Sequence, residues 1–278
     1  MDLNGPYHVE IGNTMRNDSA GTIVAAIATS RARAHIRFRL VFFLTWLILV
    51  GGLVLAIAST GRVDPEFILK YAPLFLGGVP LTIFVAVMSI VFAVGFAIFG
   101  ALGRISTKAP VYAVATLYIS LVRGTPLIVQ LIFVYSALPQ FGIVLPPIVA
   151  GVFALSFNYG AYMTEIFRAG IQAIPRGQLE AAGALGMTDS HTMRRIILPQ
   201  AVRRMVPPFI NEFATLMKLT TLGSVLAVNE LLHESENLIN TTYRPLEVYT
   251  AVAVMFGVMI YPFIWLSQQL EQRWKKNG

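Results

Sequence analysis

The chain has 278 residues, of which 56% are hydrophobic and only 13% are charged. Soluble domains carry roughly 25% charged residues, so this composition excludes an ordinary soluble domain and indicates a membrane protein. The net charge of +7 comes from Lys and Arg placed between apolar segments, which favours lipid headgroups over nucleic acid as their partner. The absence of cysteine excludes disulfides, thiolate metal sites and cysteine nucleophiles.

The chain begins with a polar tail, residues 1–39, in which Gly, Asn, Asp and Ser are scattered. We expect much of this tail to be mobile. The apolar run 40–59 follows a basic flank and ends Ala-rich, as a signal peptide does. Signal peptides keep their apolar region close to the start of the chain, so we interpret 40–59 as a retained transmembrane helix.

Five further apolar runs reach the length of about 20 residues that a transmembrane helix needs. None alternates with a period of two, so helices are predicted instead of barrel strands. The run at 110–138, the third of the six counted from 40–59, is interrupted at Arg123-Gly124-Thr125-Pro126. The predicted fold class is an all-α integral membrane protein, with these runs at residues 76–102, 110–138, 147–167, 206–228 and 248–270.

Lys and Arg are distributed unevenly between the two sides of the predicted membrane. With the N-terminus in the cytoplasm, sixteen of them lie on the inner side and three, Arg62, Lys70 and Arg244, on the outer side. Cytoplasmic loops carry the excess of Lys and Arg. Both termini and the charged segment at about 170–204 are therefore predicted to be cytoplasmic.

That charged segment contains a short amphipathic helix candidate at residues 178–187. Gly186 can take a positive φ and turn the chain, and Thr188 or Asp189 can cap a second short helix. Small alanine side chains would let another protein approach closely. An ordinary interhelical loop is the alternative.

Prolines set the expected boundaries after this segment. We expect Pro199 to end the second short helix, because proline lacks the N–H that a helix interior uses. We expect Pro207-Pro208 to stand at the start of the next span, where missing N–H groups cost least.

Four ionisable residues fall within the apolar runs: Arg123, Glu165, Glu212 and Lys218. A charge at membrane depth costs roughly 2.5–3.5 kcal/mol on insertion scales, so each is a functional candidate. Internal ion pairs, or long side chains reaching the interface, are the structural alternative. The two interpretations stay open for Glu212 and Lys218, while Arg123 is expected to act in structure or gating.

Several of these polar residues are predicted to share one cavity. Asn158, Tyr162 and Glu165 are spaced i, i+4, i+7 and so share a helix face. Gly124 and Pro126 interrupt the run at 110–138, and Gln130 follows Pro126 by one helical turn. Transporters often use broken helices for substrate, although purely structural hydrogen bonding is the alternative here.

One pattern in the charged segment matches a known motif throughout. Glu180-Ala181-Ala182 is followed by Gly186 after three residues, then by Ile196 and Leu198-Pro199. This pattern resembles the EAA loop of ABC importer permeases. Residues 123–130 are similar to the RGTPLLVQ stretch of polar amino-acid permeases, residues 158–168 to their NSGAYxxEixR stretch, and residues 170–178 to GIQAIPKGQ.

The resemblance runs from about residue 74 to the last span. It implies a type I ABC importer permease fold with a five-helix core at 74–272, and the helix at 40–59 as an extra N-terminal transmembrane helix. It implies an EAA loop that couples ATPase motion to alternating access. The residues assigned to this coupling are Glu180, Ala181, Ala182, Gly186, Leu185 and Arg176; those assigned to the substrate are Glu165, Asn158, Gln130, Thr125, Tyr162 and Lys218.

The implied function is uptake of polar amino acids or close analogues across a bacterial inner membrane. The implied partners are a cytoplasmic ATP-binding subunit dimer, a second or related permease, an external solute-binding protein and membrane lipid, without nucleic acid. The chain has no G-x-x-x-x-G-K-[ST] loop, so ATP and magnesium belong to the partner ATPase and this chain needs no cofactor. The four histidines lack metal-ligand spacing, and no metal site is predicted.

The chain departs from the family pattern at two positions. Tyr159 stands where Ser is common, and Leu219 stands where Asp follows the lysine. A particular amino acid is therefore not assigned as the substrate. An ATP-independent carrier or channel is the alternative function; it predicts inverted repeats and leaves the EAA loop unexplained. A membrane scaffold that only recruits a soluble partner is a third.

Overall fold

The computed structural model describes residues 63–276 continuously and, before them, residues 40–41, 43–45, 47–49, 51–52, 59 and 61. The predicted tail lies outside the described residues. The described residues from 40 to 52 are helical, but the transmembrane helix predicted at 40–59 stays a prediction. The chain divides into two compact units, residues 1–63 and Asp64–Gly278, and the second carries the described fold.

The second unit is helical, with no strand among residues 63–276. Two of its short elements, η1 and η3, are single turns of π-helix, called π-turns here, and η2 and η4 are short 3-10 helices. In chain order the elements are α2 (Pro65–Arg104), α3 (Ala109–Arg123), α4 (Leu127–Ile132), η1 (Phe133–Ala137), η2 (Leu138–Phe141), α5 (Pro147–Gln172), α6 (Arg176–Ala184), α7 (Asp189–Thr192), η3 (Met193–Ile197), α8 (Leu198–Leu219), η4 (Thr220–Leu226), α9 (Leu231–Thr242) and α10 (Pro245–Lys276).

The first of these helices, α2, is longer than the run predicted at 76–102. Its N-cap is Asp64, whose carboxylate accepts hydrogen bonds from the backbone N–H groups of Glu66 and Phe67. The helix has 40 residues, or about 60 Å at 1.5 Å per residue, twice the ~30 Å hydrocarbon core. Lys70, expected in an outer loop, therefore lies within α2. Polar composition marked the edge of the apolar run but did not end the helix.

Small residues allow α2 to pack closely against α5. The Oγ1 of Thr164 donates a hydrogen bond to the Gly160 carbonyl at 2.8 Å. A Cβ added to Gly100 would collide with the Thr164 side chain, and one added to Gly160 would meet Phe96 at 2.5 Å. Glycine at such positions lets helix backbones approach in a membrane. Around this crossing lies a core that includes Ala93, with α8 and α10 contributing to it.

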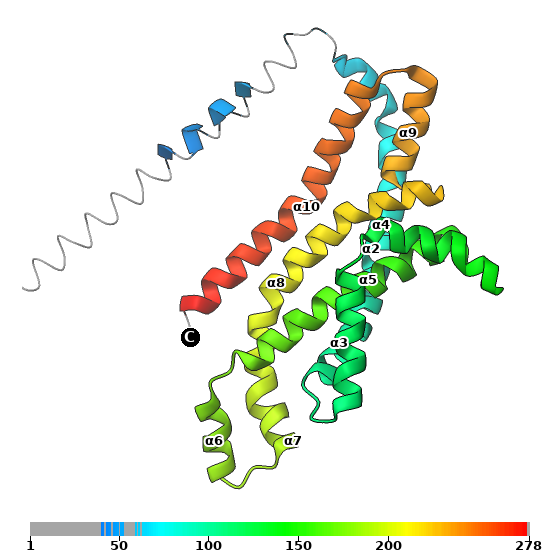
Figure 1. Cartoon of the computed structure of the whole chain (residues 1–278). Coiled ribbons are helices and arrows are strands. Elements are labelled where there is room, and N and C mark those ends of the chain that lie inside the picture. The colour runs from blue at the N-terminus through cyan, green and yellow to red at the C-terminus, as the bar shows by residue number, and fades with distance from the viewer. Residues whose placement is uncertain are drawn as a thin grey trace, which may run out of the picture. The chain divides into compact units, whose positions relative to one another are not determined.

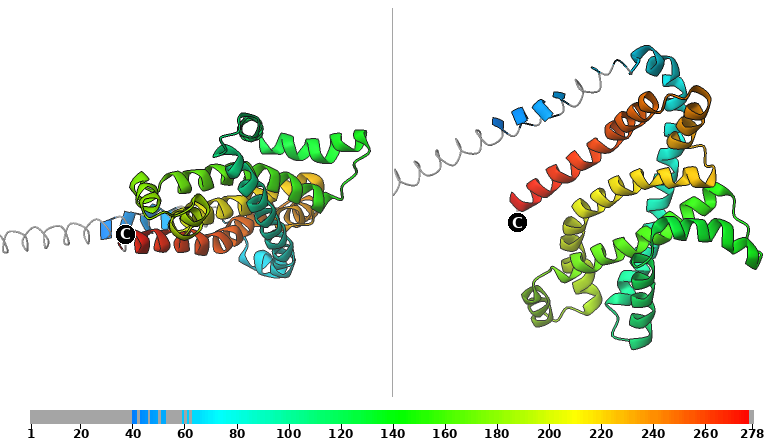
Figure 2. Two further views of the ribbon diagram at one scale, coloured as in Figure 1. Left: turned by 90° about the horizontal axis from the view of Figure 1, so that it is seen from below. Right: turned by 45° about the horizontal axis from the view of Figure 1, so that its top comes forward.

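The interruption predicted within the apolar run at 110–138 is confirmed. Between α3 and α4 the chain bends by 103° at Gly124–Pro126, and α4 leads away from the direction of α3 (Figure 2). Among the described helices, α2 and α10 are long and apolar enough to cross a membrane by themselves, and the bent pair has the length and composition of either a broken span or a re-entrant loop. The crossings predicted for α5 and α8 stay predictions, because neither is among the described helices that are long and apolar enough to cross a membrane.

The charged segment and α9 lie at opposite ends of the second unit. Helices α6 and α7 form a hairpin beyond the end of α5, whereas α9 lies beside the start of α10 (Figure 1). The chain therefore presents the charged segment at about 170–204, called the EAA-like segment from here on, at one end of the bundle. The outer loop that the charge distribution predicts lies at the other end.

Both proline predictions were wrong. Helix α8 begins at Leu198, so Pro199 lies in its first turn and Pro207-Pro208 lie inside it. The π-turn η3 precedes Pro199, with the Leu198 N–H donating to the Met193 carbonyl. A π-turn shifts the hydrogen-bond ladder by one residue, which lets the helix continue through the proline. Ser267 of α10 donates to the Pro207 carbonyl at 2.9 Å.

Candidate functional site

A cavity of about 600 Å³ lies where the α3–α4 break faces α5 and α8. The break contributes Arg123 and Thr125, α5 contributes Asn158 and Tyr162, and α8 contributes Glu212. The volume falls within the ~300–1,000 Å³ range of small-molecule sites. A cavity with polar and charged walls, at a point where a helix is broken, is typical of substrate sites in transporters.

Gln130 holds the break in its shape. Its Nε2 donates to the Val122 carbonyl at 2.7 Å and contacts Thr125 Oγ1 at 2.7 Å and the Thr125 carbonyl at 3.2 Å. Its Oε1 accepts a hydrogen bond from Asn158 Nδ2 at 3.1 Å. Proline lacks an N–H, so the bend frees backbone carbonyls that need other donors at membrane depth. Gln130 supplies them and fixes the buried Asn158.

The two charged residues of the cavity stand on different elements. The Arg123 guanidinium lies 5.0 Å from the centroid of the Tyr162 ring, a cation–π contact that orients it. Glu212 is half-buried on α8. Within residues 63–276, no ion pair closer than 4.0 Å joins Arg123 to Glu212. One cavity therefore offers a cation and an anion that do not neutralise each other directly.

Glu165 lies outside this cavity. Its carboxylate accepts from Arg168 at 2.7 Å and forms an ion pair with Arg104 of α2 at 3.6 Å. Arg168 also contacts Gln172, and Arg104 donates to Thr116 of α3 at 2.8 Å. This charge cluster joins the C-terminal ends of α2 and α5 to the middle of α3.

The EAA-like segment has the local geometry that its sequence predicts. Gly186 has φ +74° and follows α6, and the Met187 N–H donates to the Ala182 carbonyl at 3.0 Å, which closes the helix as a Schellman motif. Thr188 caps α7 by accepting from the His191 N–H. Ala182 is buried, whereas Leu185 is 80% exposed.

This segment is anchored to the helices on either side of it. Arg204 of α8 donates to the Ala173 carbonyl at 2.6 Å, and Gln200 of α8 donates to Gln178 at 3.4 Å. Ile174 and Ile197 pack in one apolar cluster with the start of α8. These contacts join the segment that contains α6 to α5 and α8, two of the helices that wall the cavity.

Comparison with known proteins identifies the family. Residues 93–276 match the family described as the binding-protein-dependent transport system inner membrane component, over more than half of the chain. The chain belongs to this family. Its fold is that of a type I ABC importer permease.

The chain matches permease proteins over nearly the whole length of each relative. The L-cystine transport system permease protein TcyB of Bacillus subtilis is 36% identical over 205 residues, 73% of this chain and 88% of TcyB. The glutamine transport system permease protein GlnP of Escherichia coli K12 is 33% identical, over 73% of this chain and 94% of GlnP. A crystal structure of an amino acid ABC transporter with histidines is 40% identical, with a TM-score of 0.72, over 76% of this chain and 99% of that chain.

Permease subunits of this kind are not catalytic, and ATP hydrolysis belongs to a separate subunit. Membership of the family implies an ATPase partner and a solute-binding protein. The permease therefore contributes the pathway through the membrane and a surface that receives the motion of the ATPase.

The structure brings together some of the predicted substrate residues of the permease and separates others. Thr125, Asn158 and Tyr162 line the cavity, with Gln130 bonded behind them. Glu165 shares a helix face with Asn158 but is held by Arg104 and Arg168. Lys218 is exposed and does not line the cavity.

Sequence reasoning did not assign several other lining residues to the substrate, among them Leu127, Tyr159, Thr215 and Leu219. Thr215 follows Glu212 by three residues, so helical spacing was a signal for it. Leu219 and Tyr159 are the two departures from the family pattern, and both line the cavity. The positions at which this permease differs from that pattern thus converge on one site.

Proposed function

We propose that this chain is the permease subunit of an ATP-driven importer for amino acids, and that the cavity between the α3–α4 break, α5 and α8 contacts the solute. The observation that carries the proposal is that Arg123 and Glu212 both line one cavity without forming a direct ion pair. An amino acid is a zwitterion. The guanidinium suits its carboxylate and the Glu212 carboxylate suits its ammonium group.

The neighbouring polar groups support this assignment. Thr125 and Asn158 also line the cavity and offer hydrogen bonds, and the Tyr162 ring contacts the Arg123 guanidinium. The names of the relatives TcyB and GlnP refer to L-cystine and glutamine, both amino acids. Tyr159 and Leu219 make the wall more apolar than the family pattern, so we assign them to the choice among amino-acid side chains.

Glu165 and Lys218 have a different place in this proposal. Glu165 is engaged by two arginines, so we assign it to the closed inner end of the pathway. Its contact with substrate requires another state of the alternating-access cycle, in which Arg168 or Arg104 releases it. Lys218 contacts the solute only in such a state, because it does not line the described cavity.

We infer that α6 is the element that docks on the ATPase. Leu179 on this helix is 50% exposed, Leu185 immediately after the helix is 80% exposed, and Glu180 is also exposed. Exposed apolar side chains on a polar segment favour a protein interface. Ala181 and Gly183 have little or no side chain, so a partner protein can approach the backbone of α6 closely there. Arg176 is the first residue of the helix. With this docking we propose that α6 and both termini lie in the cytoplasm, as the charge distribution predicts.

We further infer that two permease copies, or this chain and a related permease, form the pathway together. One set of five core helices is too few to enclose it. With the ATPase dimer and the solute-binding protein, the pair would move amino acids inward across a bacterial inner membrane.

The proposal is tested with Arg123→Gln and Glu212→Gln in the complete transporter, by titrating amino-acid-stimulated ATP hydrolysis in vesicles. A hydrogen bond to a charged group contributes about 1.5–3 kcal/mol, so each variant should weaken the apparent amino-acid affinity at least about tenfold. The control is Glu234→Gln, which removes a carboxylate from α9, remote from the cavity. Wild-type affinity in both cavity variants would contradict the assignment.

A further inference from the structure

An apolar groove of about 610 Å³ runs along one side of α2, between α5 and the first half of α8. Ile98 and Leu102 of α2, Phe167 of α5, and Val202 and Phe209 of α8 form much of its wall. Ile98, Leu102 and Val202 are exposed. The groove is large enough for a small ligand, and its surface is suited to a hydrocarbon chain.

The length of the groove corresponds to one leaflet of a bilayer. Along α2 its lining extends from Val94 to Ile105, which is about 16 Å at 1.5 Å per residue. Half of the ~30 Å hydrocarbon core is about 15 Å. Ile105 immediately follows the last residue of α2, where the apolar run ends in Arg104 and the polar turn to α3. The groove thus ends where the charged residues begin.

A single cation marks that end of the groove. Arg194 of η3 lines it, and its described lining contains no other charged residue. Arg194 is exposed, and no other residue of the 63–276 region forms an ion pair or hydrogen bond with its guanidinium. Basic residues at the cytoplasmic end of grooves between transmembrane helices attract anionic lipid headgroups.

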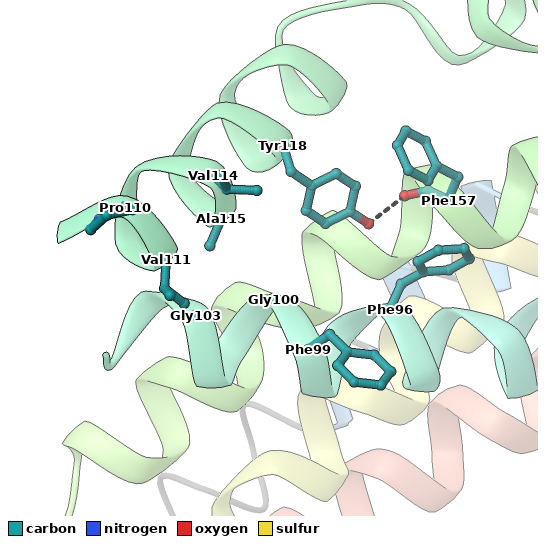
Figure 3. A pocket seen from close by; sticks show the side chains of 10 residues that line it. All are labelled: Phe96, Phe99, Gly100, Gly103, Pro110, Val111, Val114, Ala115, Tyr118 and Phe157. Carbon is teal, nitrogen blue, oxygen red and sulfur yellow. Dashed lines mark hydrogen bonds between the residues drawn. The ribbon is translucent and has the colours of Figure 1, made fainter. Parts of the chain in front are cut away.

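A second groove provides an internal comparison. It has about 620 Å³ and lies between α2, α3 and α5, where Phe96, Phe99 and Tyr118 line it (Figure 3). The Tyr118 hydroxyl donates to the Phe157 carbonyl at 2.7 Å, so it is already engaged. The described lining of this groove has no charged side chain. It can accept hydrocarbon but has nothing to select a headgroup.

We propose that the groove between α2, α5 and α8 binds an anionic phospholipid of the cytoplasmic leaflet. One acyl chain lies along Ile98, Leu102 and Val202, and Arg194 contacts the phosphate of the headgroup. The site goes beyond the proposed function, and it uses the same membrane orientation. Met193 and Arg194 connect α7 to α8, so the bound lipid braces the EAA-like segment against α2.

The test uses the purified transporter in phosphatidylcholine vesicles that contain spin-labelled phosphatidylglycerol or spin-labelled phosphatidylcholine. Electron paramagnetic resonance measures the motionally restricted fraction of each lipid. The wild-type protein should retain phosphatidylglycerol preferentially. Arg194→Gln should lower that preference about fivefold, the equivalent of ~1 kcal/mol for one cation at an anionic membrane surface.

The matched control is Arg203→Gln, which removes the same charge from α8 at an exposed position outside the groove. Its lipid preference should equal that of the wild type. An unchanged preference in Arg194→Gln, or an equal loss in Arg203→Gln, would overturn the proposal, because the charge would then act only as part of a general basic surface.

Val202→Trp tests the acyl-chain part of the site by filling the groove. It should reduce the restricted fraction of both labelled lipids, while the thermal unfolding of the detergent-solubilised protein stays close to that of the wild type. If the variant instead alters the number of copies in the complex and leaves lipid binding unchanged, the groove is an interface between chains and the lipid site is rejected. The Arg194 and Arg203 pair decides the question even if Val202→Trp does not fold.

Discussion

At the scale of single residues, the cavity depends on side chains that satisfy a broken backbone. Gln130 makes three donor contacts across the α3–α4 break and accepts one from Asn158. The amide therefore serves structure first, and the substrate through Asn158. Sequence placed Gln130 near the cavity because it follows Pro126 by one turn, but it did not indicate that the side chain turns back onto Val122.

Gln130→Ala should destabilise the permease by about 1–3 kcal/mol, because a carbonyl at membrane depth loses its donor and Asn158 loses its acceptor. Thermal unfolding of the purified protein in detergent measures the loss. Gln140→Ala, at an exposed position in η2, is the matched control and should unfold as the wild type does. Equal unfolding temperatures for the two variants would show that Gln130 does not support the break.

Glu165 shows why local spacing was insufficient. The i, i+4, i+7 pattern correctly put it on one helix face with Asn158 and Tyr162. Its partner Arg168 lies within the same turn, and Arg104 comes from another helix. A long-range ion pair of this kind has no signal in a single sequence. That Arg123 and Glu212 line the same cavity was missed for the same reason, since it depends on how α8 packs against the α3–α4 break and α5.

At the scale of elements, helix ends and turns were the most predictable features. Gly186 with its positive φ and the Thr188 cap follow from local chemistry, as does the break at Gly124–Pro126. Helix continuation through Pro199 was not predictable, because the π-turn before it changes which N–H groups are needed. The extent of α2 was also missed, since its first residues are held by the Asp64 cap and by packing against α9 and α10.

The close contact of α2 with α5 gives a prediction about glycine. Gly100→Ala should destabilise the permease by about 1–3 kcal/mol, because the added methyl group would collide with Thr164. Gly95→Ala is the control on the same helix, where a Cβ has nothing within 4 Å. That variant should be neutral or slightly stabilising, since alanine favours helix. Thermal unfolding of both proteins is the measurement, and the reverse order would contradict the packing.

The start of α9, outside the predicted spans, should respond to pH. Burial raises the pKa of Glu230 to about 7, against the backbone N–H groups of Leu232 and His233, whose hydrogen bonds favour the charged form. A carboxyl with a raised folded-state pKa stabilises the fold below about 4.5, its unfolded value, and that contribution is lost as pH rises through about 7.

Hydrogen exchange of the α9 amides, corrected for intrinsic rates, should therefore show more frequent opening at pH 8 than at pH 5.5. Glu230→Gln cannot ionise and should remove most of that difference. The same pH dependence in wild type and variant would assign the effect to other groups.

At the scale of the whole molecule, composition and motifs were sufficient for the class. Apolar runs with intervening basic residues predicted a helical membrane protein, and the family match bears this out. Packing between helices was beyond the sequence, and with it the position of the cavity. The direction of the chain across the membrane, the second permease copy and the helix at 40–59 remain predictions, which a complex purified from native membranes can test.

The central claim is that ATP hydrolysis in a partner drives amino-acid import through this chain by way of α6. The most direct measurement is ATP-dependent uptake of a labelled amino acid by vesicles containing the complete transporter, with wild-type chain or Glu180→Lys. Glu180 is exposed on α6, so the fold should persist while uptake falls at least tenfold. Undiminished ATP-driven uptake by a correctly assembled Glu180→Lys transporter, or uptake that needs no ATP, would contradict the account.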